Sequence, residues 1–173
     1  MSSNSDEDKA LSLLEYYGID TCMYSKISIT ALSIVCFHYK NESLALSILE
    51  FPEINYNHVD TFKNTALIYA CVGPYLENVA LKLLHFDDIN YNYVNNSGNS
   101  ALILACKNNL EKVALKLLKK EDININQINN TGYTALIYAC VNKMEKVALK
   151  LLEKENINYN QISVDLQFNY IEI

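Results

Sequence analysis

The chain has 173 residues, half of them apolar, and is therefore long enough to bury a hydrophobic core. Its formal net charge is −6 and no cluster of Lys or Arg stands out, which argues against nucleic acid and anionic membranes as partners. No apolar run approaches the roughly 18 residues that a membrane helix needs. The acidic opening, MSSNSDEDK, is neither a secretory signal nor a transit peptide, and five cysteines without a CxxC pair predict a reduced, cytoplasmic protein.

Three short phrases recur along the chain at a nearly constant interval. TALIYAC occupies residues 65–71 and 134–140, with SALILAC at 100–106 between them. VALKLL and an isoleucine before Asn or Asp repeat in the same register. The Thr or Ser that opens the first phrase falls at Thr30, Thr65, Ser100 and Thr134, at spacings of 35, 35 and 34 residues. Residues 1–173 are therefore predicted to be a single domain of repeated units.

In chain order, the markers predict an acidic tail with a half repeat, four full repeats and a terminal segment. The boundaries are 1–23, 24–58, 59–93, 94–127, 128–161 and 162–173. The half repeat supplies only an outer helix, about residues 6–17, that caps one end of the stack. The terminal VDLQFNYIEI alternates apolar and polar residues, so it either caps the fourth repeat or pairs with a second chain.

Each full repeat is predicted to hold two helices and an extended finger. Thr or Ser is the N-cap of the first helix, in which small Ala and Cys residues allow close packing. The second helix, such as residues 111–118, places its apolar residues on one stripe. The Asn-rich stretch that follows has strand and turn character. A period of 34 equally suits a tetratricopeptide repeat, but that repeat needs two longer helices that fill nearly the whole unit.

The pattern resembles the ankyrin family over about residues 10–162. The family's T-P-L-H-x-A-A phrase appears as residues 65–71, and its D-x-x-G-x-T approach as 95–100 and 129–134. The resemblance implies an all-α solenoid of ankyrin repeats, each a helix-turn-helix with a β-hairpin finger, with four full repeats and partial terminal caps. The Asn-, Ile- and Tyr-rich composition is similar to ankyrin arrays of giant amoeba viruses and AT-rich protists, which implies a host cytoplasm if the chain is viral.

The chain departs from the family pattern in ways that bear on stability. The family's histidine, which links neighbouring repeats by hydrogen bonds, is replaced by Ser33, Ile68, Ile103 and Ile137. Apolar stacking is therefore expected to substitute for part of that polar network. Lys63 stands where a glycine turns the finger, which predicts an altered turn because lysine disfavours positive φ. The first two repeats also carry one extra residue between their helices.

Four cysteines, Cys36, Cys71, Cys106 and Cys140, occupy the same position of successive inner helices. The resemblance places neighbouring repeats about 10 Å apart. A disulfide tolerates at most about 7 Å between Cα atoms, and zinc needs several sulfurs about 2.3 Å from one ion. These cysteines are therefore predicted to be small buried hydrophobes. Cys22, in a loop, is the one expected to react with a thiol reagent.

No pattern predicts a catalytic, cofactor or metal site, because the three histidines neither share helical spacing nor neighbour a nucleophile in a repeated way. The resemblance instead implies a non-enzymatic, monomeric module that binds a protein or peptide through its concave groove and finger tips. The positions that vary within the family and face the partner correspond to Phe62, Asn64, Tyr69, Asn96, Ser97, Asn99, Leu104, Lys107, Asn108, Asn130, Thr131, Tyr133, Tyr138, Val141 and Asn142. The inner-helix ends Phe37, His38 and Val72 add to this surface.

Several interpretations stay open at this point. Tyr69 and Tyr138 either pack between repeats or form a ladder of rings that anchors the partner. The chain is alternatively an assembly component that self-associates through its terminal segment, or the recognition adaptor of a larger complex. The resemblance also implies that Asn55, Asn90, Asn124 and Asn158 match the position modified by a 2-oxoglutarate-dependent asparaginyl hydroxylase.

Overall fold

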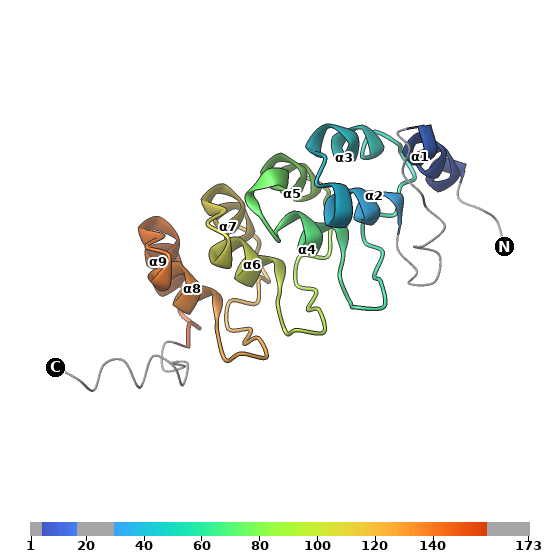
Figure 1. The fold of residues 1–173 in the computed structure, drawn as a ribbon. Helices are drawn as coiled ribbons and strands as arrows, with labels where there is room; N and C mark the ends of the chain where they lie inside the picture. The colour runs from blue at the N-terminus through green and yellow to red at the C-terminus, as the bar shows by residue number, and fades with distance from the viewer. Residues whose placement is uncertain (1–4, 17–29, 159–173) are drawn as a thin grey trace. The chain divides into compact units, whose positions relative to one another are not determined.

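The computed structural model describes residues 5–16 and 30–158 of the chain. Cys22 and the terminal segment 162–173, for which reactivity and capping are predicted, lie outside the described residues. The chain divides into two compact units, Met1–Asn90 (unit 1) and Tyr91–Ile173 (unit 2). Each unit is built from pairs of short helices joined by long fingers (Figure 1).

Unit 1 begins with α1 (Ser5–Tyr16), followed by α2 (Ala31–Ile34) and the π-helical turn η2 (Val35–Tyr39). The helices α3 (Glu42–Ile48), α4 (Ala66–Ala70) and α5 (Glu77–Leu83) complete it, with the 3₁₀ turn η3 (Pro74–Leu76) before α5. The inner helices α2 and α4 pack on each other, as do the outer helices α3 and α5, and α1 packs on α2. This is the predicted alternation of inner and outer helices.

Unit 2 repeats the arrangement with two pairs of helices. The first pair is α6 (Ala101–Lys107) and α7 (Glu111–Leu117), and the second is α8 (Ala135–Val141) and α9 (Glu145–Leu152). Inner helix packs on inner helix and outer on outer, with the core between them. Leu102, Ile103, Val113 and Leu117 are fully buried there.

The predicted N-caps are confirmed in all four repeats. The hydroxyl oxygens of Thr30, Thr65, Ser100 and Thr134 each accept a hydrogen bond from the backbone N–H three residues later, at 3.2–3.4 Å. Each cap satisfies an N–H group that has no partner inside the helix. The opening hydroxyl of the repeated phrase therefore fixes where every inner helix begins.

The extra residue of the first two repeats is accommodated in two different ways. In the first repeat the inner helix widens into η2, and the N–H of Lys40, at φ 47°, donates to the Val35 carbonyl at 2.7 Å. In the second repeat Gly73 is extended, at φ −167°, and leads into η3. The corresponding residues of the last two repeats, Asn109 and Lys143, end the inner helices directly at positive φ.

The fingers have fewer paired backbone groups than the predicted β-hairpins. Within the described residues they hold no β-strand, only an isolated bridge between Val94 and Ser100. Two backbone bonds close each tip. The N–H groups of Asp60, Asn95 and Asn129 donate to the carbonyl four residues later, at 3.0–3.1 Å, and their carbonyls accept the N–H three residues later, at 2.9–3.0 Å. The side-chain oxygens of those three residues accept hydrogen bonds from backbone N–H groups of the tip, which a longer pair of β-strands would bond to carbonyls.

The finger turn keeps one conformation with or without glycine. Lys63 has φ 59°, beside 76° at Gly98 and 82° at Gly132, so the predicted altered turn at Lys63 is wrong. Gly98 cannot be replaced by another residue, but the reason is its close contact with the next finger and not its φ angle. A Cβ atom there would lie 2.8 Å from the Cα of Asn129 in the next finger, closer than real Cβ contacts allow.

Three asparagines form an asparagine ladder between successive fingers: Asn57, Asn92 and Asn126. The Nδ2 atom of Asn92 donates to the Asp122 carbonyl at 2.7 Å, and its Oδ1 atom accepts the N–H of Asn124 at 2.9 Å. Asn57 and Asn126 repeat this pair of bonds with the fingers that follow them. Polar bonds, and not apolar stacking alone, therefore stand in for the absent histidine network.

Asn92→Asp is expected to lower the free energy of unfolding by about 1–2 kcal/mol. The carboxylate keeps the acceptor for Asn124 but loses the amide donor and faces the Asp122 carbonyl oxygen. Asn124→Asp is the matched control, because the Asn124 side chain only accepts, from the Asn126 N–H at 3.2 Å. Urea denaturation at pH 7 compares the two variants, and equal losses would contradict a bridging role for the ladder.

Candidate functional site

The finger tip of unit 1 is organised around a buried carboxylate. One oxygen of Asp60 accepts the N–H groups of Phe62 and Asn64, both at 2.8 Å. The other accepts the hydroxyl of Tyr69, which itself accepts the Asn64 amide at 3.1 Å. Phe62 is left projecting from this tip, 52 % exposed. The tip therefore presents one large apolar side chain on a fully hydrogen-bonded turn.

Tyr69 is a structural residue in this arrangement. Its side chain is 5 % exposed and its ring lies against Phe37, with centroids 5.0 Å apart. The pKa of Tyr69 is raised above its usual value of 10.0, mainly because the side chain is buried and also because its hydroxyl bonds to Asp60. With its hydroxyl held by Asp60 and Asn64, the packing interpretation is the one the geometry favours for this tyrosine.

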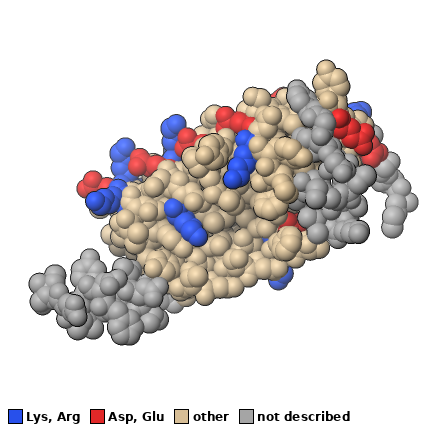
Figure 2. All heavy atoms as spheres, in the orientation of Figure 1, with Lys and Arg blue, Asp and Glu red and all other residues tan. Residues whose placement is uncertain are grey.

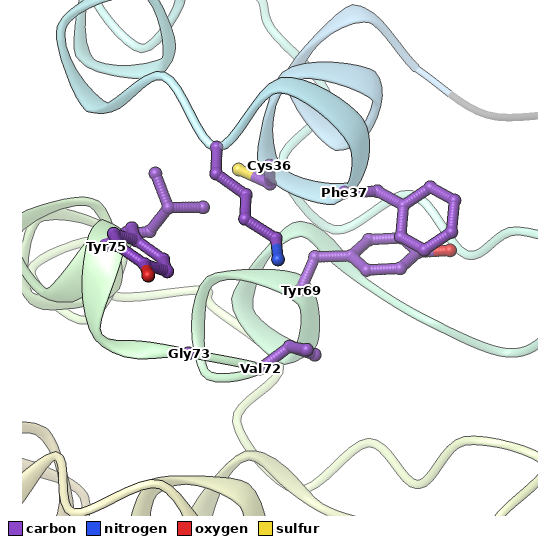
Figure 3. A pocket seen from close by; sticks show the side chains of 8 residues that line it. Cys36, Phe37, Tyr69, Val72, Gly73 and Tyr75 are labelled. Carbon is purple, nitrogen blue, oxygen red and sulfur yellow. The ribbon is translucent and has the colours of Figure 1, made fainter.

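A small pocket opens beside Phe37 and Tyr69 (Figure 3). Phe37 lies on one side, Tyr75 on the other, and Val72 and Gly73 between them, with Cys36 behind. Its volume is about 20 Å³, room for one water-sized group. Lys40 also lines it, with its Nζ atom 5.8 Å from the centre of the Tyr75 ring.

The analogous surface of unit 2 carries a pair of stacked rings. Tyr133 and Tyr138 have centroids 4.9 Å apart, and the Nζ atom of Lys107 stands 5.8 Å from the centre of the Tyr138 ring. Both rings are half-buried, unlike Tyr69. Asn129 takes the place of Asp60 and donates to the Tyr138 hydroxyl only weakly, at 3.4 Å. Tyr138 is therefore more exposed to solvent than Tyr69.

The other predicted positions of unit 2 differ in how much surface they present. Leu104 is buried, and the side-chain amide of Asn142 is occupied by the carbonyls of Cys106 and Lys107, both at 2.9 Å. Asn99 and Asn108 are half-buried. The exposed members are Asn96, Ser97, Lys107, Asn130, Thr131 and Val141. They lie at the finger tips and inner-helix ends, and contact with a partner stays a prediction for each of them.

Five residues that line the pocket are absent from the predicted set of binding residues: Cys36, Lys40, Gly73, Tyr75 and Leu76. Their positions depend on the extra residue in the first two repeats, which η2 and η3 accommodate. The one available signal was the interval between the helices, which the sequence shows to be one residue longer there. That signal marks the location but not the shape of the turn.

A family model of ankyrin repeats, in three copies, matches residues 32–129 and 77–163. The chain belongs to the ankyrin-repeat family. Ankyrin repeats are general protein–protein interaction modules, and proteins of the family are generally non-enzymatic.

A solved structure of similar fold is an ankyrin repeat domain from Acinetobacter baumannii AYE. Its TM-score is 0.61 and its sequence identity 23 %, over 92 % of this chain and 82 % of that one. This likeness supports the ankyrin fold alone. A comparison with curated proteins found no match. The resemblance to viral or protist arrays stays a prediction, because neither match bears on it.

The four candidate hydroxylation sites of the ankyrin fingers are all exposed. Asn55, Asn90, Asn124 and Asn158 leave their side chains at the surface. The backbone N–H groups of the last three are bound by the asparagine ladder, which holds each finger in a fixed conformation. Modification of these residues stays a prediction.

The ankyrin cysteines are buried in three of the four repeats. Burial raises the pKa of Cys36 and Cys106 to about 12. Cys140 is exposed, so the prediction of burial is wrong for this one. Its helix, α8, belongs to the last repeat that the structure describes, and no further described repeat stacks on it.

A brief iodoacetamide pulse at pH 8 is expected to alkylate Cys140 in the native protein and to leave Cys36, Cys71 and Cys106 unmodified. Buried thiols are inaccessible, and the raised pKa of Cys36 and Cys106 also keeps these two from forming the reactive thiolate. Peptide mass mapping reads each site, and labelling after unfolding in urea is the positive control. Alkylation of Cys106 as fast as Cys140 would contradict the assignment.

Two further observations concern metal binding and membrane insertion. In the part of the chain that the structure describes, no three His, Cys, Asp or Glu side chains lie together as metal ligands would. Among the same residues, every helix is too short or too polar to cross a membrane.

Proposed function

We propose that this ankyrin-repeat chain is a non-enzymatic module that binds a protein or peptide partner at its inner-helix ends and finger tips. The observation that carries the proposal is that large apolar side chains are exposed at the inner-helix ends and finger tips. Phe37, Phe62, Val72 and Tyr75 in unit 1, and Val141 in unit 2, lie at those places, whereas Tyr16, Leu149 and Leu152 are exposed on the helices α1 and α9. Exposed aromatic and aliphatic residues are common anchors at protein interfaces.

The scaffold around these anchors supports the proposal. The finger tips are held by side-chain hydrogen bonds to Asp60, Asn95 and Asn129, and successive fingers by the asparagine ladder. A surface fixed before binding loses little conformational entropy when a partner arrives. The family's general role and the absence of any nominated catalytic group point the same way. We also propose a reducing, cytoplasmic location, which suits the free thiols of the four described cysteines.

The proposal is tested by affinity capture from cell lysate. A variant carrying Phe62→Ala and Tyr133→Ala is compared with wild type, after circular dichroism shows both to be equally folded. Leu149→Ala is the control, because Leu149 is 56 % exposed but belongs to the outer helix α9. The proposal predicts a protein retained by wild type and by the control and lost by the double variant.

Capture of the same proteins by all three chains would count against these surfaces. Retention of only further copies of the chain would favour the alternative, an assembly component that self-associates through residues 162–173. Light scattering over a concentration series measures that association directly. A third function, the recognition adaptor of a larger complex, would appear as co-captured subunits of that complex.

A further inference from the structure

The pocket of unit 1 is lined by residues from two irregular turns, η2 and η3. Cys36, Phe37 and Lys40 come from or follow η2, while Val72, Gly73 and Tyr75 come from the approach to η3. Each turn accommodates the residue by which its repeat exceeds those of unit 2. Single π-helical turns within α-helices occur often at functional sites. The pocket is thus the product of two separate departures from the regular repeat.

The walls of the pocket are apolar and partly exposed. Phe37, Val72 and Tyr75 are all exposed to solvent by more than two-fifths, with Tyr75 at 65 %. Gly73 contributes no side chain, so the space between Val72 and Tyr75 stays open (Figure 3). At about 20 Å³ the pocket admits the tip of one short side chain but not a ring. Its small size and apolar walls suit a small aliphatic group.

The rim of the pocket is positively charged. Lys40 is the charged residue of the lining, and none of the lining residues is acidic. Within the described residues Lys40 forms no salt bridge, and its ammonium group rests near the Tyr75 ring. On the face drawn in Figure 2, lysines stand singly on an otherwise uncharged surface, with most acidic side chains along its edge. A carboxylate next to the aliphatic group would complement this charge.

We propose that this pocket binds a partner segment in which an aliphatic side chain enters between Phe37 and Tyr75 while a neighbouring Asp or Glu pairs with Lys40. The inference rests on the proposed function and specifies the chemistry of the partner. A phosphate group fits less well, because one lysine supplies the only positive charge of the lining. Phosphate sites use several cationic or backbone N–H donors.

Two variants probe the pocket without disturbing the fold. Gly73 has extended backbone that any residue adopts, and a Cβ atom there would meet only the Tyr75 ring, at 3.7 Å. Gly73→Ala therefore adds a methyl group at the wall of the pocket and reduces its space. Lys40→Met removes the charge and keeps most of the aliphatic stem. Lys119→Met is the control, since Lys119 is an exposed lysine that follows the outer helix α7 and does not line the pocket.

The probe is a phage-displayed library of random 12-residue peptides, selected on the full chain. The proposal predicts a consensus with an aliphatic residue within two positions of Asp or Glu. Fluorescence anisotropy of a selected peptide should show its Kd raised about tenfold by Gly73→Ala. Lys40→Met should raise it about two- to fivefold, the size of an exposed ion pair, and Lys119→Met should leave it unchanged.

A double-mutant cycle tests whether the acidic residue of the peptide pairs with Lys40. Replacing the acidic residue of the peptide with its amide should weaken binding to wild type and to Lys119→Met, but not to Lys40→Met. The inference would be overturned by selected peptides that lack the acidic residue. It would also be overturned if the peptides bind Gly73→Ala as tightly as wild type, or if the cycle shows no coupling to Lys40. Failure to select any peptide would overturn it as well. Loss of those peptides on Phe62→Ala instead would leave the interaction function standing, and the lysate capture tests that function independently.

Discussion

Tyr69→Ala is expected to lower the free energy of unfolding by about 3–5 kcal/mol, and Tyr138→Ala by less than about 2 kcal/mol. The two tyrosines sit at the same place in the same heptapeptide, but Tyr69 is 5 % exposed and Tyr138 is half-buried. Loss of Tyr69 empties its packing site beside Phe37. It also removes a donor to the buried carboxylate of Asp60. Urea denaturation at pH 7 measures both variants.

Tyr69→Phe separates the ring from the hydroxyl. It keeps the packing and is expected to cost about 1–2 kcal/mol through the hydrogen bond alone. The pKa of Tyr69 is raised in the folded protein, so ionisation favours unfolding once the unfolded tyrosine begins to lose its proton near pH 10. Stability should fall as the pH rises above that value, and less so in Tyr69→Phe. Equal losses for Tyr69→Ala and Tyr138→Ala would contradict the distinction between the two sites.

Leu117→Ala and Leu151→Ala are each expected to cost about 2–5 kcal/mol. Both side chains are fully buried between the inner and outer helices of unit 2. Leu149→Ala is the control in the same helix as Leu151, where the side chain is exposed, and should cost less than about 1 kcal/mol. Thermal and urea unfolding would show the difference. A loss at Leu149 equal to that at Leu151 would mean that α9 buries a different face.

The helices and their caps could be predicted because they depend on local chemistry. A hydroxyl at Thr65 or Thr134 bonds an N–H three residues away, and nothing distant alters that bond. The two TALIYAC phrases show where this reasoning ends. Tyr69 meets Asp60 and Phe37, whereas Tyr138 meets Asn129 and Tyr133. One phrase therefore gives a core residue in one repeat and a surface residue in another.

The asparagine ladder could not be predicted, because each of its bonds joins residues 30 to 33 positions apart. In the sequence these asparagines suggest turns and finger chemistry, and only the stacked fingers reveal that one amide serves two neighbours. The pocket is a similar case. An extra residue in two repeats was visible, but whether it forms a π-helical turn or a 3₁₀ turn depends on Gly73 and Pro74 in the second repeat and on their absence from the first.

The link between the inner and outer helix tolerates a change of length without a change in its surroundings. The caps at Thr30 and Thr65 and the packing of α3 on α5 are intact although both repeats carry the additional residue. Insertions and deletions over evolutionary time can therefore accumulate there while the hydrophobic core stays the same. For protein engineering, the stretch from Val72 to Tyr75 is accordingly the place in unit 1 to graft a new recognition loop.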